Sequence, residues 1–269
     1  MAWTQVCHQY DGTFAGFLTC VFESYVNHEE PVEFRGPEDP CCSLYPLRTI
    51  ATHPERAKRV YRSLGPRLGP EGREWVIRGF LTCLPQRELY LWRFLRMGFC
   101  RGPAVIRELT DPRVDKLRKA VLFLNREAHL YTGFTRFSDL HGVLAGEIQP
   151  KNRVLPLLRP HFCGRYPQEK LVLHDSTHGE ALFHQPGKWA ILPVEGFTLG
   201  PAGAEELAFR QMWRAFYDTI AIEGRRNEKC RMTQMPKRYW AAMTEFQKDW
   251  DTALPQVAGQ KPPISSIGD

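Results

Sequence analysis

Residues 130–194 contain five short runs that decide the fold: LYTGFTRF (130–137), VLAGEIQ (143–149), LVLHD (171–175), EALFH (180–184) and WAILPV (189–194). Each run is rich in branched or aromatic residues and is bounded by turn residues, as β-strands are. We therefore expect an antiparallel sheet of about four or five strands. Between the second and third runs, residues 150–167 have the spacing of a short helix that its prolines limit.

The N-terminal half predicts helices instead. Apolar residues recur there at spacings of three and four, which is typical of amphipathic helices. The expected helices span residues 14–25, 52–64, 74–84, 86–99 and 112–127, with Thr52 capping the second. Val6–Tyr10 predicts a strand, and residues 31–46, with four prolines, predict a loop.

A long C-terminal helix is expected from Glu205 to Glu223 because five large apolar residues share one stripe. These are Phe209, Met212, Trp213, Phe216 and Ile220, and we expect them to lie in the core. The expected fold class is α+β: a helical N-terminal half packed with the antiparallel sheet, and the long C-terminal helix. We expect one domain over residues 1–250, with a helical part (11–127), a sheet part (128–195), a C-terminal basic helix and loop (203–248), and a disordered tail at 251–269.

The composition limits the class of protein. The 269 residues carry a formal charge of +6, whose sign favours an anionic partner. The eight cysteines include no CxxC pair, which argues against a zinc ribbon. No apolar run approaches the roughly 18 residues that span a bilayer, and the first residues do not form a secretory signal. We therefore expect a cytoplasmic protein with reduced thiols and no membrane partner.

The C-terminal basic segment, residues 209–240, is the first candidate for nucleic-acid binding. It holds eight basic and three acidic side chains, so much of the positive charge of the chain lies here. Closely spaced basic side chains contact successive phosphates, and neighbouring aromatic rings stack on bases. The candidates are Arg225, Arg226, Lys229, Arg231, Lys237, Arg238 and Tyr239. The alternative is that Tyr239 and Trp240 belong to the core and that the arginines pair with acids of the protein.

A second basic cluster lies between residues 150 and 167. Its members surround the apolar sequence PLLRPHF and predict a phosphate-binding face on the short helix. They are Lys151, Arg153, Arg159, His161 and Arg165. A solvated helix face explains the same pattern.

Candidate catalytic residues are fewer. The sequence HDSTHGEALFH holds His174, Asp175 and His178, residue types that ligate metals or move protons. A turn that Asp175 begins and Gly179 completes suits the same sequence. Asp11 is a further carboxylate candidate, although capping the following helix is the simpler role. Because the motifs of phosphate loops, dinucleotide turns, zinc helices and radical SAM clusters are absent, we expect no metal site and no bound cofactor.

Three separated motifs carry a family resemblance: YDGTFAGFLTCVFESY (10–25), FTRF with IQPKNRVLPLLRPHFCGRYP (134–137 and 148–167), and MWRAFYDTIAIEGRRNEKCRMTQMPKRYW (212–240). From residue 10 to residue 246 the chain resembles a bacterial family of unknown-function domains catalogued as DNA metabolism or DNA repair proteins. The resemblance implies a partnership with a radical SAM protein, whose gene commonly lies beside those of the family. Some members carry a fused uracil-DNA glycosylase domain, to which nothing after Trp250 is similar. Gly224 departs from the family, which usually has a polar or charged residue there.

These observations favour a nucleic-acid-binding protein of DNA metabolism or repair, with DNA, or alternatively RNA, and a radical SAM protein as partners. Two alternatives stay open. One is a stand-alone hydrolase or base-processing enzyme that uses Asp11 or the histidine region. The other is a protein-interaction adaptor whose basic surface meets an acidic partner.

Overall fold

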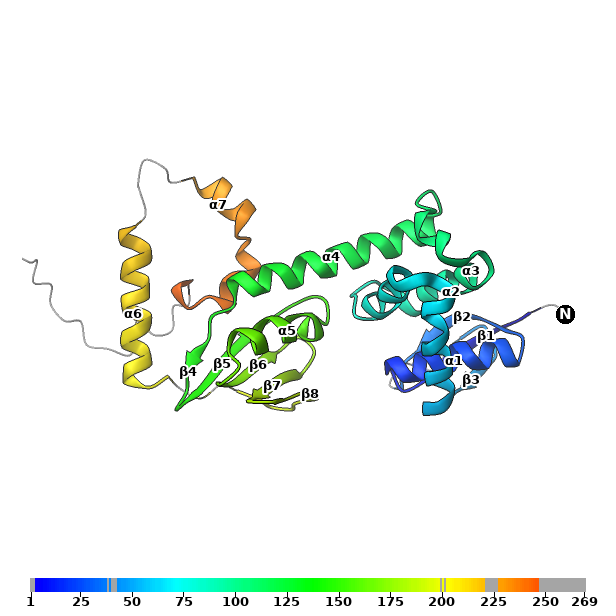
Figure 1. The fold of residues 1–269 in the computed structure, drawn as a ribbon, viewed down its shortest axis with the longest axis horizontal. Helices are drawn as coiled ribbons and strands as arrows, with labels where there is room; N and C mark the ends of the chain where they lie inside the picture. Colours follow the sequence, from blue (N-terminus) through cyan, green and yellow to red (C-terminus); the bar gives the residue numbers. More distant parts are fainter. Residues whose placement is uncertain are drawn as a thin grey trace, which may run out of the picture.

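Two lobes share one long helix, α4 (Pro112–Phe134), in the computed structural model (Figure 1). The structure describes residues 3–37, 39, 43–198, 200, 202–220 and 227–246. The first turns of α4 contribute Val114 and Leu117 to the core of the N-terminal lobe, and its last turns contribute Ala128 and Tyr131 to the core of the C-terminal lobe. Because α4 runs through Phe134, the strand predicted at 130–137 is wrong: residues 130–134 continue the helix, and residues 135–137 connect it to the next strand.

The N-terminal lobe contains a small parallel sheet that the sequence did not predict as a whole. Its strands are β1 (Thr4–Gln9), β2 (Glu29–Arg35) and β3 (Leu47–Thr49), in the order β2-β1-β3. The helix α1 (Phe14–Val26) connects β1 to β2. The loop predicted over residues 31–46 is therefore wrong for its first part. Pro31 is tolerated because β2 is an edge strand, where a missing backbone donor costs little.

Two further helices complete this lobe. They are α2 (Pro54–Phe80) and α3 (Arg87–Arg101), followed by the 3-10 helix η1 (Gly102–Arg107). The break predicted around residues 65–72 is a kink at Gly69, whose φ of 73° favours glycine. The predicted cap is wrong, since α2 begins at Pro54 after His53, and the Thr52 hydroxyl instead donates to Asp11 at 2.6 Å.

The C-terminal lobe is built on a five-stranded sheet, as expected. The strands are β4 (Ser138–Asp139), β5 (Val143–Ile148), β6 (Lys170–Asp175), β7 (Glu180–Gln185) and β8 (Lys188–Pro193), in that spatial order. The sheet is mixed and not fully antiparallel, because the helix α5 (Leu155–Arg165) returns the chain so that β5 and β6 run parallel. The α+β fold class is confirmed.

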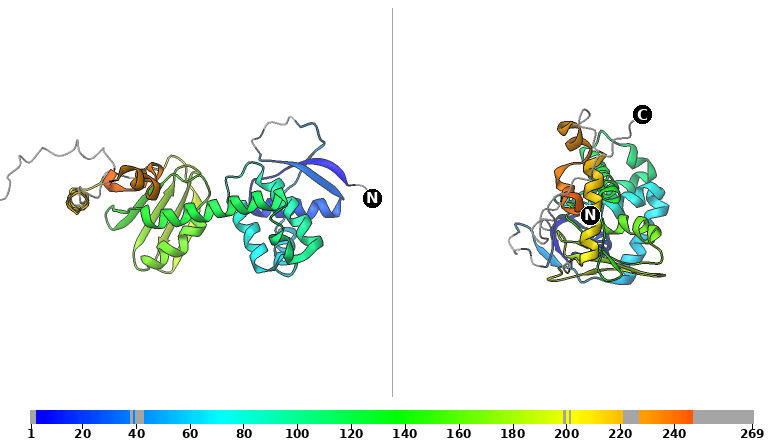
Figure 2. Two further views of the ribbon diagram at one scale, coloured as in Figure 1. Left: turned by 90° about the horizontal axis from the view of Figure 1, so that it is seen from above. Right: turned by 90° about the vertical axis from the view of Figure 1, so that its left-hand side faces the viewer.

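The C-terminal segments flank this sheet. They are α6 (Ala204–Thr219), α7 (Glu228–Gln234) and the 3-10 helices η3 (Lys237–Ala242) and η4 (Thr244–Phe246). The helix predicted over residues 205–223 ends at Thr219, with Ile220 as its C-cap, so its predicted length is not confirmed. Residues 221–223 and the predicted tail at 251–269 lie outside the described residues. Viewed from above, α6 lies at the far end of the molecule from the N-terminal lobe (Figure 2).

The apolar stripe of α6 is not in the core, which corrects the prediction. Its five side chains, Phe209, Met212, Trp213, Phe216 and Ile220, are between 41 and 59% exposed. Helical spacing establishes that they share one face, but only the neighbouring elements decide whether that face is covered. Here the polar side of the helix contacts the protein body.

Two expectations from the composition concerned the cysteines and membrane spans. The cysteines among the described residues are free thiols. None of the helices within the described ranges combines the length and apolar content needed to cross a membrane.

Candidate nucleic-acid interface

A cleft of about 560 Å³ opens in the C-terminal lobe where the end of α4 meets β5, α5 and α6. We call it the aromatic cleft. Arginines and aromatic rings make up most of the lining, and they come from three separate segments. The arginines are Arg136, Arg165 and Arg210, and the rings are Phe137, Phe162, Tyr166, Phe209 and Trp213.

The floor of the aromatic cleft is a group of packed rings. Phe137 follows the end of α4 and contacts Phe162 at 5.0 Å and Tyr166 at 5.8 Å between ring centroids. Gly146 of β5 permits this packing, since a Cβ atom there would lie 3.1 Å from both the Arg136 carbonyl oxygen and the Phe137 ring. The glycine therefore lets the segment after α4 lie directly on the sheet.

Polar contacts fix α6 as the opposite wall. Glu206 accepts hydrogen bonds from Arg210 Nε at 2.8 Å and from the Asp139 backbone N–H at 3.1 Å. Arg210 also donates to the Ser138 hydroxyl. Because these contacts hold the polar side of α6 against the sheet edge, Phe209 and Trp213 are left half-exposed at the mouth of the cleft.

The arginines of the cleft differ in how far their charge is neutralised. Arg136 forms an ion pair at 3.0 Å with the buried Glu245, and Arg210 pairs with Glu206. Arg165 is exposed, and its guanidinium contacts the Tyr166 ring and hydroxyl. Among the described residues, Arg165 has no carboxylate at ion-pair distance. It is therefore the cation of the cleft that is available to an anionic ligand.

The other candidates between residues 150 and 167 are dispersed around α5. Arg153 forms an ion pair with Glu180. The Arg159 guanidinium lies 4.3 Å from the centroid of the Trp189 ring. Lys151 and His161 are exposed. Of the predicted cluster, only Arg165 lines the aromatic cleft.

The described candidates of the C-terminal basic segment also make contacts within the protein. Arg231 pairs with Glu228. The charged groups of Arg231 and Lys237 both lie over the Trp240 ring. Arg238 lies 3.8 Å from the Glu127 carboxylate, and Lys229 is exposed. Arg225 and Arg226 lie outside the described residues.

Tyr239 belongs to the core, which corrects its prediction as a base-stacking residue. Its side chain is fully buried, and its ring packs against Tyr131 at 4.8 Å and Phe134 at 5.4 Å. Burial raises the pKa of its hydroxyl, although the charge of Arg238 opposes that effect. The ring is enclosed on all sides and presents no face for a base.

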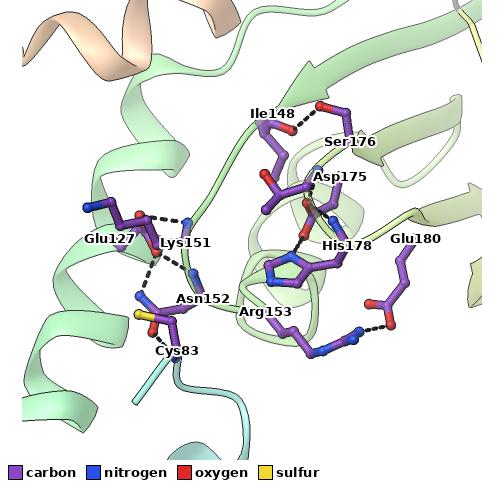
Figure 3. Close-up of polar contacts among 11 residues, drawn as sticks. Cys83, Glu127, Ile148, Lys151, Asn152, Arg153, Asp175, Ser176, His178 and Glu180 are labelled. Carbon is purple, nitrogen blue, oxygen red and sulfur yellow. Dashed lines mark hydrogen bonds and ion pairs between the residues drawn. The ribbon is translucent and has the colours of Figure 1, made fainter. Parts of the chain in front are cut away.

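The histidine region forms a structured turn between β6 and β7 (Figure 3). Asp175 is fully buried, and its carboxylate accepts hydrogen bonds from the backbone N–H groups of Thr177 and His178. His178 Nδ1 lies 2.7 Å from the same carboxylate, and Gly179 has a φ of 62°. His174 instead lies 3.4 Å from Glu147, because neighbouring strand residues point to opposite faces.

A separate polar network joins the two lobes (Figure 3). The buried Glu127 carboxylate of α4 accepts from the backbone N–H groups of Lys151 and Asn152 and from Asn152 Nδ2 at 2.6 Å. Asn152 Oδ1 accepts from the Cys83 N–H at 2.9 Å, and the Arg153 N–H donates to the Leu81 carbonyl. The turn before α3 is thus bonded to the segment before α5.

Asp11 lies in the other lobe, away from the histidine region. Its carboxylate accepts hydrogen bonds from Thr13 and from the Thr52 hydroxyl. Burial acts to raise its pKa, but these hydrogen bonds outweigh burial and the pKa lies below its usual value. Within the described ranges, no group of three or more His, Cys, Asp or Glu side chains could hold a metal ion.

Comparison with family models found one match, which covers residues 85–245, more than half of the chain. The model is that of a domain of unknown function, DUF4130. The chain belongs to this family. A comparison with curated proteins found no match. The DUF4130 segment contains every residue that lines the aromatic cleft and leaves the N-terminal sheet outside.

Sequence reasoning missed most of the cleft. Arg136 and Phe137 lie in the FTRF motif. Its aromatic and basic residues were a signal of a binding surface, but the run was used only to predict a strand. Trp213 was assigned to the core. Their convergence depends on the contacts that hold α6 against Ser138 and Asp139, which no local pattern specifies.

Proposed function

We propose that this chain binds single-stranded nucleic acid in the aromatic cleft, as a protein of DNA metabolism or repair that acts with a radical SAM protein. One observation carries the binding: an available arginine, Arg165, converges with the half-exposed rings of Phe209 and Trp213. The biological role and the radical SAM partner rest on the family resemblance of residues 10–246.

Nucleic acid offers both groups that such a cleft binds. Arg165 provides charge and planar N–H donors for a phosphate. The exposed rings provide stacking surfaces, which contribute about 1–3 kcal/mol per base in single-strand binders. A single strand presents its base faces, whereas a duplex buries them in its own stack. The cleft therefore favours a single strand.

Replacing Trp213 by alanine should weaken binding of a single-stranded oligonucleotide by roughly tenfold or more, because a stacking surface is lost. Arg165→Ala should lower the slope of log affinity against log salt by about one, because one phosphate contact is lost. Fluorescence anisotropy of a labelled oligonucleotide between ~50 and ~200 mM salt measures both effects.

A matched control exists outside the cleft. Trp189, 52% exposed on β8, is covered on one side by Arg159, so the pair repeats the same chemistry on another surface. Trp189→Ala and Arg159→Ala should leave the affinity unchanged. Equal losses in the control and cleft variants, salt-independent binding, or tighter binding of duplex DNA would contradict the proposal. Parallel titrations with single-stranded RNA decide which nucleic acid is preferred.

The two alternatives have narrower support. Asp11 lies in the other lobe and cannot act together with the histidine region. A hydrolase would therefore depend on Asp175 and His178, whose side chains contact each other. An adaptor would use the basic surface to bind an acidic protein. Nuclease treatment removes any association that DNA bridges. Capture of the radical SAM partner that persists after this treatment would therefore favour the adaptor.

A further inference from the structure

A second pocket, in the N-terminal lobe, is lined by four arginines and a single carboxylate. It has a volume of about 290 Å³ and lies between β2, α3 and the start of α4. The arginines are Arg93, Arg96, Arg101 and Arg113, and the carboxylate is Glu30. We call it the arginine pocket.

The fold holds part of this basic lining in place before any ligand binds. Five lining residues share one face of α3 because they recur at spacings of three and four. They are residues 93, 96, 97, 100 and 101. Arg96 Nη1 lies 3.0 Å from Glu30, and its guanidinium stacks 4.4 Å above the Trp3 ring. This arginine is therefore ordered by an acid on one side and an indole on the other.

The remaining arginines keep donors for a ligand. Arg101 pairs with Glu108, and Arg113 pairs with Asp111 at 2.5 Å. A guanidinium has five N–H donors and a carboxylate engages at most two of them, so donors are left on each. Arg93 is exposed, and no carboxylate in the described part of the chain lies within ion-pair distance of it.

Trp92 gives the arginine pocket an aromatic side chain. It lines the pocket, is only 1% exposed, and packs against the rings of Trp3 and Tyr25. Because water does not reach its Nε1 atom, that N–H is not among the donors that a ligand in the pocket would meet. The donors of the pocket are therefore those of the arginines.

We propose that the arginine pocket binds the phosphate group of a phosphate monoester. Its three terminal oxygens accept from several planar guanidinium groups at once, and its negative charge of about −1.5 to −2 suits a lining that adds the unneutralised Arg93 to three arginines that are each paired with one carboxylate. The arginine pocket includes Arg113 in the first turn of α4, whereas the aromatic cleft includes Thr132 and Gly133 in its last turn, so the proposal stands whether or not that cleft binds nucleic acid.

Isothermal titration calorimetry of the full chain with inorganic phosphate and with adenosine monophosphate tests the site. Both should bind the unmodified protein. Arg93→Ala should weaken binding roughly tenfold to a hundredfold, since a charge-assisted contact is lost. Arg93→Lys should restore part of the affinity by restoring the charge without the planar fork.

Arg62 supplies the matched control, because it is an exposed arginine on α2 that does not line the pocket. Arg62→Ala should bind phosphate as the unmodified protein does, and circular dichroism should show that every variant is folded. No phosphate binding, equal binding of chloride, or undiminished affinity in Arg93→Ala would overturn the proposal. A 5′-phosphorylated oligonucleotide compared with its unphosphorylated form then separates a strand end from a free nucleotide as the source of the monoester.

Discussion

Glu127→Ala is expected to lower the free energy of unfolding by about 3–5 kcal/mol, because a buried charge network loses its acceptor. The Glu127 side chain is 1% exposed and accepts hydrogen bonds from two backbone N–H groups and one side-chain amide. Without the carboxylate, the Asn152 donors are left buried and unsatisfied, and each such group costs about 1–3 kcal/mol. Urea denaturation followed by circular dichroism measures the loss.

The same substitution should loosen the junction between the lobes. Asn152 Oδ1 accepts a hydrogen bond from the Cys83 N–H, and Asn152 Nδ2 donates one to Glu127. The Glu127 carboxylate therefore orients the side chain that bonds the two lobes. Hydrogen exchange at the Cys83 and Arg153 amides should accelerate in Glu127→Ala.

Glu147→Ala is the control for this experiment. The Glu147 side chain is 39% exposed and lies 3.4 Å from the buried His174. Because the Glu147 carboxylate keeps contact with water, its removal should cost only about 0–1 kcal/mol. A loss in Glu127→Ala no larger than that in Glu147→Ala would show that the junction network does not stabilise the fold.

The second large effect is expected from His8, a fully buried residue of β1. Burial, followed by the charge of Arg48, lowers the pKa of His8 from 6.5 to about 4. Between these values the unfolded chain takes up a proton at His8 and the folded chain does not. The contribution of His8 to stability is therefore complete above pH 6.5 and is lost as the pH falls to about 4.

A shift of this size corresponds to about 3 kcal/mol of pH-dependent stability. It is measured as the difference in free energy of unfolding between the unmodified protein and His8→Gln, which has no titrating group at that position. The difference should decrease as the pH is lowered from 6.5 to about 4. Arg48→Ala should reduce the fall, since it removes a charge that opposes protonation. A difference that stays constant with pH would refute the assignment.

Local signals predicted most of the secondary structure correctly. The helices predicted from residues 14 and 112 begin at Phe14 and Pro112, although the N-cap of α1 is Thr13 and not Asp11. The errors occurred where local and tertiary preferences differ. Prolines predicted a loop where the edge strand β2 forms, and the branched and aromatic residues after Leu130 predicted a strand where packing against the second core extends α4.

The candidate site was less predictable than the fold, because the sequence shows charges but not their partners. Arg153 and Arg238 looked available for phosphate, yet Glu180 and Glu127 lie beside them through long-range folding. Arg165 could not be distinguished from these arginines by its surroundings in the sequence. Only the structure shows that it faces a cleft.

The sequence by itself determined the α+β class, the basic character and the amphipathic stripes, because each depends on residue type and on spacings of two, three or four. Tertiary structure alone decided that β5 and β6 run parallel, that Tyr239 is enclosed and that the α6 stripe is exposed. The physical reason is that spacing defines a face, whereas burial of that face and neutralisation of its charges depend on residues distant in the chain.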